Sequence, residues 1–236
     1  WYAGGAFAAA ALVSVVACGG GGTTLVETRG STAGWTWALP TNFPEPKVPA
    51  DNPMTAEKVE LGRFLFHDPR LSGNGRQACA GCHHQDKAFT DGRAQSIGST
   101  GEVHPRSAQH LSNVVYNATL TWANPSLVTL ERQMETPLFG ERPVEMGVDD
   151  SNKHAVLQRL IDDKGPAGYP QRFATVFPGE TQPVSWGNVI KAIAAFQRTL
   201  ISGNSRYDQW LAGKTGLSDA ELRGMNLFFG EKAECF

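Results

Sequence analysis

The sequence predicts a mainly α-helical protein with long loops. Three observations predict this class: apolar residues recur at helical spacing in several stretches, serine caps precede two of them, and no stretch shows sustained strand-like alternation. The 236 residues suggest one or two domains. Hydrophobic residues make up 41% and charged residues 19%, which suits a packed core. The net charge of −2, without a basic run, gives nucleic-acid binding no electrostatic basis.

Residues 1–18 predict an export signal. Residues 6–17 form an apolar stretch that is too short to span a membrane but has the length of a signal-peptide core. The stretch ends Val15-Val16-Ala17-Cys18-Gly19, which resembles a bacterial lipobox, so we expect a lipid anchor on Cys18. A plain signal peptide that contains a cysteine is the alternative. Both place the protein in the periplasm or at the outer membrane and cell surface, and a lipid on Cys18 would be its one membrane contact.

A flexible arm is expected over residues 19–53. Four glycines follow Cys18, and five prolines fall between residues 40 and 53, so this part of the chain should be extended and semi-rigid. Trp35 and Trp37 lie in the arm, and we expect them to pack onto the folded body.

Four helices are expected beyond the arm. The first spans residues 55–66 and ends before Asp68-Pro69, because proline cannot continue a helix. A loop-rich region follows over residues 72–143. A short helix over 153–163 should carry Leu157, Leu160 and Ile161 on one face. Ser185 can cap a longer helix, whose apolar stripe comprises Trp186, Val189, Ile190, Ile193, Phe196 and Leu200. Residues 218–221 form a capping-box pattern before the last helix, with Leu222, Met225 and Phe229 turned inward.

Residues 79–83, Cys-Ala-Gly-Cys-His, carry the strongest chemical signal. Two cysteines three positions apart on a helical turn point the same way, so both can form thioethers with the vinyl groups of one haem. The adjacent His83 is then placed to ligate the iron. A thioredoxin-like redox pair lacks its βαβ context, a zinc site lacks its other ligands, and a disulfide across two residues would be strained. The pattern therefore predicts covalent haem on Cys79 and Cys82, with His84 as a surface neighbour.

Cys235 is the other cysteine beyond the signal segment, and it follows the last expected helix. A helix in this position is also expected directly before a second turn that attaches haem. An isolated buried cysteine fits the spacing equally well, so the residues alone leave both interpretations open.

Several motifs follow one another in a specific order beyond residue 60. They are Leu61–Ser72, Cys79–His83, Phe89–Gly92, Leu111–Asn113, Asn117, Trp122, Leu130–Gln133, Pro137, Glu145–Met146 and Ala195–Asn204, followed by Cys235. This order resembles the bacterial di-haem cytochrome c peroxidases and the related MauG enzymes. Residues 119–126 and 137–146 are more similar to a subgroup that includes the methanobactin-operon di-haem enzymes, which oxidise a tryptophan on a partner protein.

The resemblance implies two cytochrome c-like haem domains. The first, peroxidatic domain is expected over residues 54–180, and residues 181–236 are expected to be the start of a second domain that is truncated here. Cys235 would then carry part of the second haem c attachment.

The resemblance also implies roles for residues around the first haem. Glu145 corresponds to the acid–base that moves a proton between the oxygens of peroxide, and Gln133 to a residue of the same distal pocket. Trp122 corresponds to a tryptophan between the two haems that relays electrons, and Pro137 to a proline packed over the pocket. Taken alone, Glu145 would equally fit a solvated loop and Trp122 a core position.

Three positions depart from the family pattern. Ser107 stands where many relatives have an asparagine that binds calcium between the domains, which puts a calcium ion in doubt here. His104 lies closer to Ser107 than the distal histidine of peroxidases that need reductive activation, so we expect a permanently open first haem. Ala233 stands where MauG has a tryptophan that passes on oxidising equivalents. No role is expected for His67, His110 or His154.

The sequence therefore predicts a peroxidase that reduces hydrogen peroxide at the first haem. A second haem would relay electrons from an external donor, either a small cytochrome c or a cupredoxin. One alternative is a MauG-like enzyme that oxidises a partner protein, and another is a non-enzymatic electron-transfer cytochrome. A high-spin ferric haem that reacts with peroxide would distinguish the enzymes from the carrier.

Overall fold

The computed structural model describes residues 26–30, 35–41, 43–122 and 124–235. The described residues fall into two compact units. The larger unit contains Trp35 and residues 46–202, and the smaller unit contains residues 26–30, 36–41, 43–45 and 203–235. The signal segment and Cys18 lie outside the described residues, so the expected lipid anchor stays a prediction.

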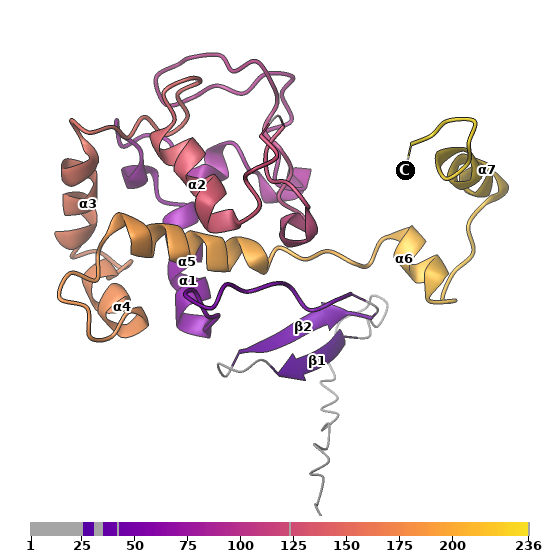
Figure 1. The fold of residues 1–236 in the computed structure, drawn as a ribbon, viewed down its shortest axis with the longest axis horizontal. Coiled ribbons are helices and arrows are strands. Elements are labelled where there is room, and N and C mark those ends of the chain that lie inside the picture. The colour runs from indigo at the N-terminus through magenta and orange to yellow at the C-terminus, as the bar shows by residue number, and fades with distance from the viewer. Residues whose placement is uncertain (1–25, 31–34, 42, 123, 236) are drawn as a thin grey trace, which may run out of the picture. The chain divides into compact units, whose positions relative to one another are not determined.

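The larger unit is helical and rich in loops, as the sequence predicts (Figure 1). Its α-helices are α1 (Ala56–Phe66), α2 (Leu130–Phe139), α3 (Lys153–Ile161), α4 (Tyr169–Val176) and α5 (Trp186–Arg198). Short 3₁₀ turns occupy Pro69–Leu71, Cys79–Gly81, Gln85–Lys87 and Val114–Tyr116. No helix among the described residues is long and apolar enough to span a membrane.

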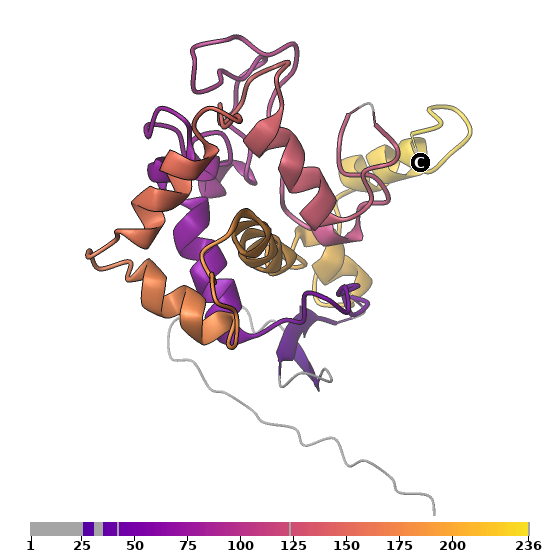
Figure 2. The same cartoon turned by 60° about the vertical axis from the view of Figure 1, so that its left-hand side comes forward.

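Helices α1 and α5 cross at the centre of the larger unit (Figures 1 and 2). Both begin at a capping hydroxyl, and the cap at Ser185 is the one predicted: the Thr55 hydroxyl accepts from the Lys58 N–H at 3.1 Å, and the Ser185 hydroxyl accepts from the Asn188 N–H at 3.3 Å. At the crossing, a Cβ on Gly62 would lie 1.9 Å from the carbonyl oxygen of Ala192. The two backbones can approach this closely only because residue 62 has no side chain.

The core forms where helices α1 to α5 face one another. Its buried apolar side chains include Leu61, Leu65, Phe66, Met134, Leu138, Val156, Leu160, Phe173, Val189 and Ile193. Burying each such side chain contributes about 1.5–3 kcal/mol. The predicted stripe of α5 is confirmed, because Trp186, Ile190 and Leu200 also pack against this core. The core is the scaffold that carries the loops between residues 67 and 148.

Hydrogen bonds join the loop after α1 to helix α3. The Arg159 guanidinium donates to the carbonyl oxygens of Arg70 at 3.0 Å, Ser72 at 2.8 Å and Gly73 at 2.9 Å. The Gly73 N–H in turn donates to the Met146 carbonyl at 2.8 Å. These bonds hold the segment that leads to Cys79 against the segment around residue 146.

The smaller unit contains a β-hairpin and two helices. Strands β1 (Val26–Gly30) and β2 (Thr36–Pro40) pair antiparallel, with Val26 opposite Pro40 and Gly30 opposite Thr36. Helices α6 (Arg206–Leu211) and α7 (Asp219–Phe228) both begin with a complete capping box. The box at Ser218 is the one predicted from the sequence.

Some expectations for the helices and the arm are wrong. Part of the arm is a hairpin rather than a loop, whereas the burial of Trp37 in β2 is compatible with the packing expected for it. Helices α2, α4 and α6 were not expected. On α3, Val156 faces the core while Ile161 is exposed, and on α7 Phe229 is exposed instead of inward.

The expected boundary between two haem domains stays a prediction, although the compact units divide the chain elsewhere. The sequence placed it after residue 180, whereas the larger compact unit continues to Ser202. The physical reason is that the apolar stripe of α5 completes the core of the larger unit, so helix α5 belongs with α1.

Gly62→Ala should lower the free energy of unfolding by about 1–3 kcal/mol, because the new methyl group overpacks the crossing of α1 and α5. Urea unfolding followed by circular dichroism measures the change. Gly187→Ala is the matched control on α5, since its Cβ would meet nothing within 4 Å. The control should keep or raise stability, by at most about 1 kcal/mol. Equal stability of the two variants would contradict the close crossing.

Candidate functional site

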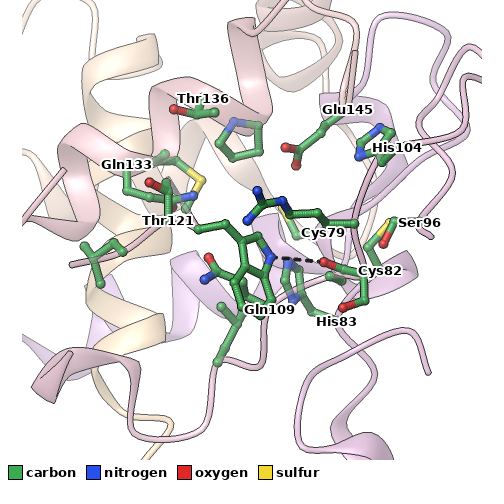
Figure 3. Close-up of a pocket in the computed structure, with 18 of the residues that line it drawn as sticks. Cys79, Cys82, His83, Ser96, His104, Gln109, Thr121, Gln133, Thr136 and Glu145 are labelled. Atoms are coloured by element: carbon green, nitrogen blue, oxygen red, sulfur yellow. Dashed lines mark hydrogen bonds between the residues drawn. The ribbon is translucent and has the colours of Figure 1, made fainter. Parts of the chain in front are cut away.

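A cavity of about 740 Å³ in the larger unit gathers six of the seven predicted site residues. The lining includes Cys79, Cys82, His83, Gln133 and Glu145 (Figure 3). Trp122 also lines it. Cys235 does not line the cavity; it is exposed and lies in the smaller unit. The cavity has the size usual for cofactor sites.

The segment around Cys79 brings two thiols to the cavity wall. Residues Cys79–Gly81 form a 3₁₀ turn, and the Cys82 and His83 N–H groups donate to the Cys79 carbonyl at 3.1 and 3.0 Å. Burial raises the pKa of the Cys79 thiol to about 12, and it also raises the pKa of Cys82. Both sulfurs are therefore neutral thiols near pH 7, and one turn presents them to the same space.

A backbone carbonyl orients the imidazole of His83. Its Nδ1 lies 2.7 Å from the Phe89 carbonyl oxygen, which can only accept, so Nδ1 carries the hydrogen and Nε2 is left as the ligating nitrogen. Ala88 and Phe89 are both left-handed, with φ of 52° and 62°, a conformation that non-glycine residues rarely adopt. Burial lowers the pKa of His83, although hydrogen bonds with the backbone of Phe89 and Gln109 act to raise it. The ring therefore stays neutral. Neutral imidazole is the form that binds iron.

Glu145 lies at the cavity on a segment that is bonded to its neighbours. The Met146 N–H donates to the Pro137 carbonyl at 2.9 Å, and the Ser99 N–H donates to the Glu145 carbonyl at 2.8 Å. Burial raises the pKa of the Glu145 carboxyl, and the charge of His104 opposes this shift. A raised pKa makes a carboxyl group a better proton acceptor, as acid–base chemistry at the cavity would require.

Helix α2 supplies a second wall of the cavity. Gln133, Thr136 and Pro137 all line the cavity, and Figure 3 shows Gln133 and Thr136 on this helix. The sequence predicted the position of Gln133 and Pro137 at the pocket through the family resemblance, but it did not predict the helix that places them.

Trp122 lies at the rim and is 57% exposed. Its indole Nε1–H donates to the Ser107 carbonyl at 3.4 Å, and the Arg106 guanidinium carbon lies 5.8 Å from the centre of its ring. An exposed indole that also lines the cavity connects the cavity with solvent. The expectation that a lone tryptophan would be a core residue does not hold here.

Sequence reasoning missed part of the lining. His104, Gln109, Ser96 and Thr121 also face the cavity. His104 was considered only as a distal ligand, yet its Nε2 lies 3.1 Å from the Val144 carbonyl and thus beside Glu145. That contact spans 40 residues and leaves no pattern in the sequence. Among the residues that the structure describes, no group of three or more His, Cys, Asp or Glu could hold a metal ion, so calcium stays an untested expectation.

The residues present fit a covalently attached haem. Cys79 and Cys82 could form the two thioethers, and His83 could ligate the iron through Nε2. Glu145 and Gln133 come from other elements of the cavity wall and are free of that attachment. Such an arrangement can bind a small polar molecule between an iron centre and a carboxylate.

Comparison with known proteins points the same way. The family model of di-haem cytochrome c peroxidase matches residues 56–216. The chain is 35% identical over 197 residues to methylamine utilization protein MauG of Methylorubrum extorquens, covering 83% of this chain and 52% of that protein. It is 38% identical over 199 residues to cytochrome-c peroxidase IdrP1 of Denitromonas iodatirespirans, covering 82% and 49%.

A solved structure is more similar still. The crystal structure of a MauG-like protein associated with microbial copper homeostasis superposes with a TM-score of 0.81 at 53% identity, covering 85% of this chain and 57% of that one. This chain spans about half the length of the curated relatives it matches.

Gly98→Ala should displace the loop that contacts the Glu145 segment. A Cβ at residue 98 would lie 1.8 Å from the Val144 carbonyl oxygen, so we expect a loss of about 1–3 kcal/mol in the free energy of unfolding. Ser99→Ala is the control, because it keeps the backbone N–H that donates to Glu145. Unfolding of both variants at the same urea concentration would show that the loop does not approach Val144 this closely.

Proposed function

Because the chain belongs to the di-haem cytochrome c peroxidase family, we propose that it reduces hydrogen peroxide at a haem c that Cys79 and Cys82 would attach and whose iron His83 would ligate. One observation carries the proposal: the anchored imidazole of His83 and the carboxyl group of Glu145 line the same cavity from different elements. An electron carrier has no need of a carboxyl group with a raised pKa in this position.

A haem held by Cys79, Cys82 and His83 would supply a redox-active iron that can give two electrons to hydrogen peroxide. Glu145 would accept a proton from one oxygen of hydrogen peroxide and return it to the other, which can then leave as water when those electrons break the O–O bond. Its raised pKa makes it a stronger base than an ordinary glutamate. Gln133 offers amide hydrogens and an amide oxygen on the neighbouring wall, which suits the orientation of peroxide.

Electrons for the reaction come from outside the cavity in this proposal. A second haem c, attached in part through Cys235, would relay them through Trp122 from a small cytochrome c or a cupredoxin. The exposure of Trp122 at the rim supports a role in electron exchange. The enzyme would act in the periplasm or at the outer membrane, held there by the lipid expected on Cys18.

Oxidation of a partner protein is the second candidate function. The same exposed indole favours it, since a side chain that lines the cavity and reaches solvent could exchange electrons with a docked protein. Relatives named MauG and a MauG-like structure at 53% identity are compatible with this alternative.

Glu145→Gln should slow the reaction with hydrogen peroxide by about 10²–10⁴-fold, the usual contribution of a general acid–base. The rate is measured by stopped-flow absorbance of the haem-loaded chain. In the unaltered chain the rate should fall as pH drops through the raised pKa of Glu145, because the carboxylate is the reactive form.

Glu141→Gln is the matched control for this change. It removes the same charge four residues away from an exposed side chain that does not line the cavity. Haem content should be equal in both variants. A Glu145→Gln chain that reacts as fast as Glu141→Gln would refute the acid–base role.

Replacing both Cys79 and Cys82 with alanine should abolish covalent haem at this site, because no thiol then remains at the cavity wall. Haem staining of a denaturing gel, together with peptide mass spectrometry, measures the attachment. Cys235→Ala is the comparison, and it should leave haem on the peptide that contains residues 79–83. Haem on that peptide in the double variant would contradict the proposed attachment.

A further inference from the structure

Loop 96–104 holds the backbone next to Glu145. The Ser99 N–H donates to the Glu145 carbonyl oxygen at 2.8 Å, and the Glu102 carboxylate accepts from the Val144 N–H at 3.0 Å. His104 Nε2 lies 3.1 Å from the Val144 carbonyl oxygen. Val144 is therefore bonded through both its N–H and its C=O, which fixes the direction in which the next side chain leaves the backbone.

His104 also acts on the Glu145 side chain. Its ring is only 8% exposed and lines the cavity, and Figure 3 shows it beside Glu145. A carbonyl oxygen only accepts, so Nε2 carries the hydrogen of this bond and donates it to Val144. Positive charge on the ring stabilises the nearby Glu145 carboxylate.

Other titratable or charged side chains line the same cavity, and those outside the attachment motif differ from His104 because they are exposed. They are Cys79, Cys82, His83, Arg106, His110 and Arg142. Three of these side chains lie outside the attachment motif and are exposed: Arg106, His110 and Arg142. Water and salt therefore screen their charge. The buried ring of His104 is the group whose charge opposes the effect of burial on Glu145.

We propose that His104 is a positioning residue for Glu145: its Nε2–H holds the Val144 carbonyl, and its ring charge acts on the Glu145 carboxylate. This inference rests on the proposed function, because it assigns His104 to the acid–base of that reaction. It differs from a role as iron ligand, since the Nε2 nitrogen is engaged by a backbone carbonyl.

Two substitutions separate the two effects of His104. His104→Gln keeps an N–H donor near the position of Nε2 but removes the charge, and His104→Leu removes both. In the haem-loaded chain, the carboxylic acid C=O band of Glu145 is titrated by infrared difference spectroscopy and identified by its absence in Glu145→Gln. The rate of reaction with peroxide is measured against pH in the same samples.

We expect the Glu145 band in both His104 variants to titrate at higher pH than in the unaltered chain, because the opposing positive charge is gone. The acid limb of the rate profile should move in the same direction. His104→Gln should keep the rate at high pH, whereas His104→Leu should lose about tenfold at every pH through misplacement of the carboxyl group. His154→Gln, which makes the same change at an exposed position of α3, should leave the band and the profile unchanged.

The outcomes distinguish this inference from the function on which it rests. Haem content and circular dichroism show whether each variant folds, and His104→Gln, which keeps the donor, gives the test if His104→Leu does not fold. If Glu145→Gln is slow but the His104→Gln band and profile stay at the unaltered pH, the role of His104 is overturned alone. If Glu145→Gln reacts at the unaltered rate, the proposed function fails and this inference fails with it.

Discussion

The close crossing of α1 and α5 is the contact on which the larger unit depends. The two helices are separated by more than a hundred residues of sequence, most of them in loops and short helices. Closing so long a segment has a large entropic cost, which the buried stripe of α5 offsets by packing against α1 and the other helices. Gly62 allows the approach, and the intervening chain is then held at both ends. The loops that carry the site can be irregular because this framework limits where they go.

Within that framework, hydrogen bonds with backbone groups of the loops, rather than regular secondary structure, position the residues of the site. The Phe89 carbonyl orients His83, and the bonds to Val144 and Glu145 hold the carboxyl-bearing segment. Each bond requires an unusual local feature, either the left-handed Ala88 and Phe89 or the missing side chain of Gly98. Such features persist only when the surrounding contacts determine them, and they concentrate at functional sites. The irregularity of residues 72–148 is therefore consistent with a site built to hold fixed groups.

Features that depend on neighbouring residues in sequence could be predicted. The cap and the stripe of α5, the start of α1 and the capping box of α7 all follow from local spacing, and so does the common direction of Cys79 and Cys82. Helix α2 was missed because Pro137 lies inside it and polar residues interrupt its apolar pattern. The hairpin β1–β2 was missed because its pairing joins residues as far apart along the chain as Val26 and Pro40. The importance of His104 comes from a contact with Val144, 40 residues away, which no local pattern contains.

The cavity separates a buried end, where protons would move, from an exposed rim, where electrons would move. Glu145 and His104 lie at the first, and Trp122 and Arg106 at the second. A cation beside an indole disfavours its oxidation, so the 5.8 Å approach of Arg106 at first argues against electron relay through Trp122. The size of the penalty depends on solvent: at this distance it is about 0.7 kcal/mol in water but about 3 kcal/mol at an effective dielectric constant of 20. Because both side chains are exposed, water and salt screen the charge of Arg106, and the penalty lies between these two figures. Exposure at the rim is therefore what makes an electron-relay role for Trp122 compatible with its charged neighbour.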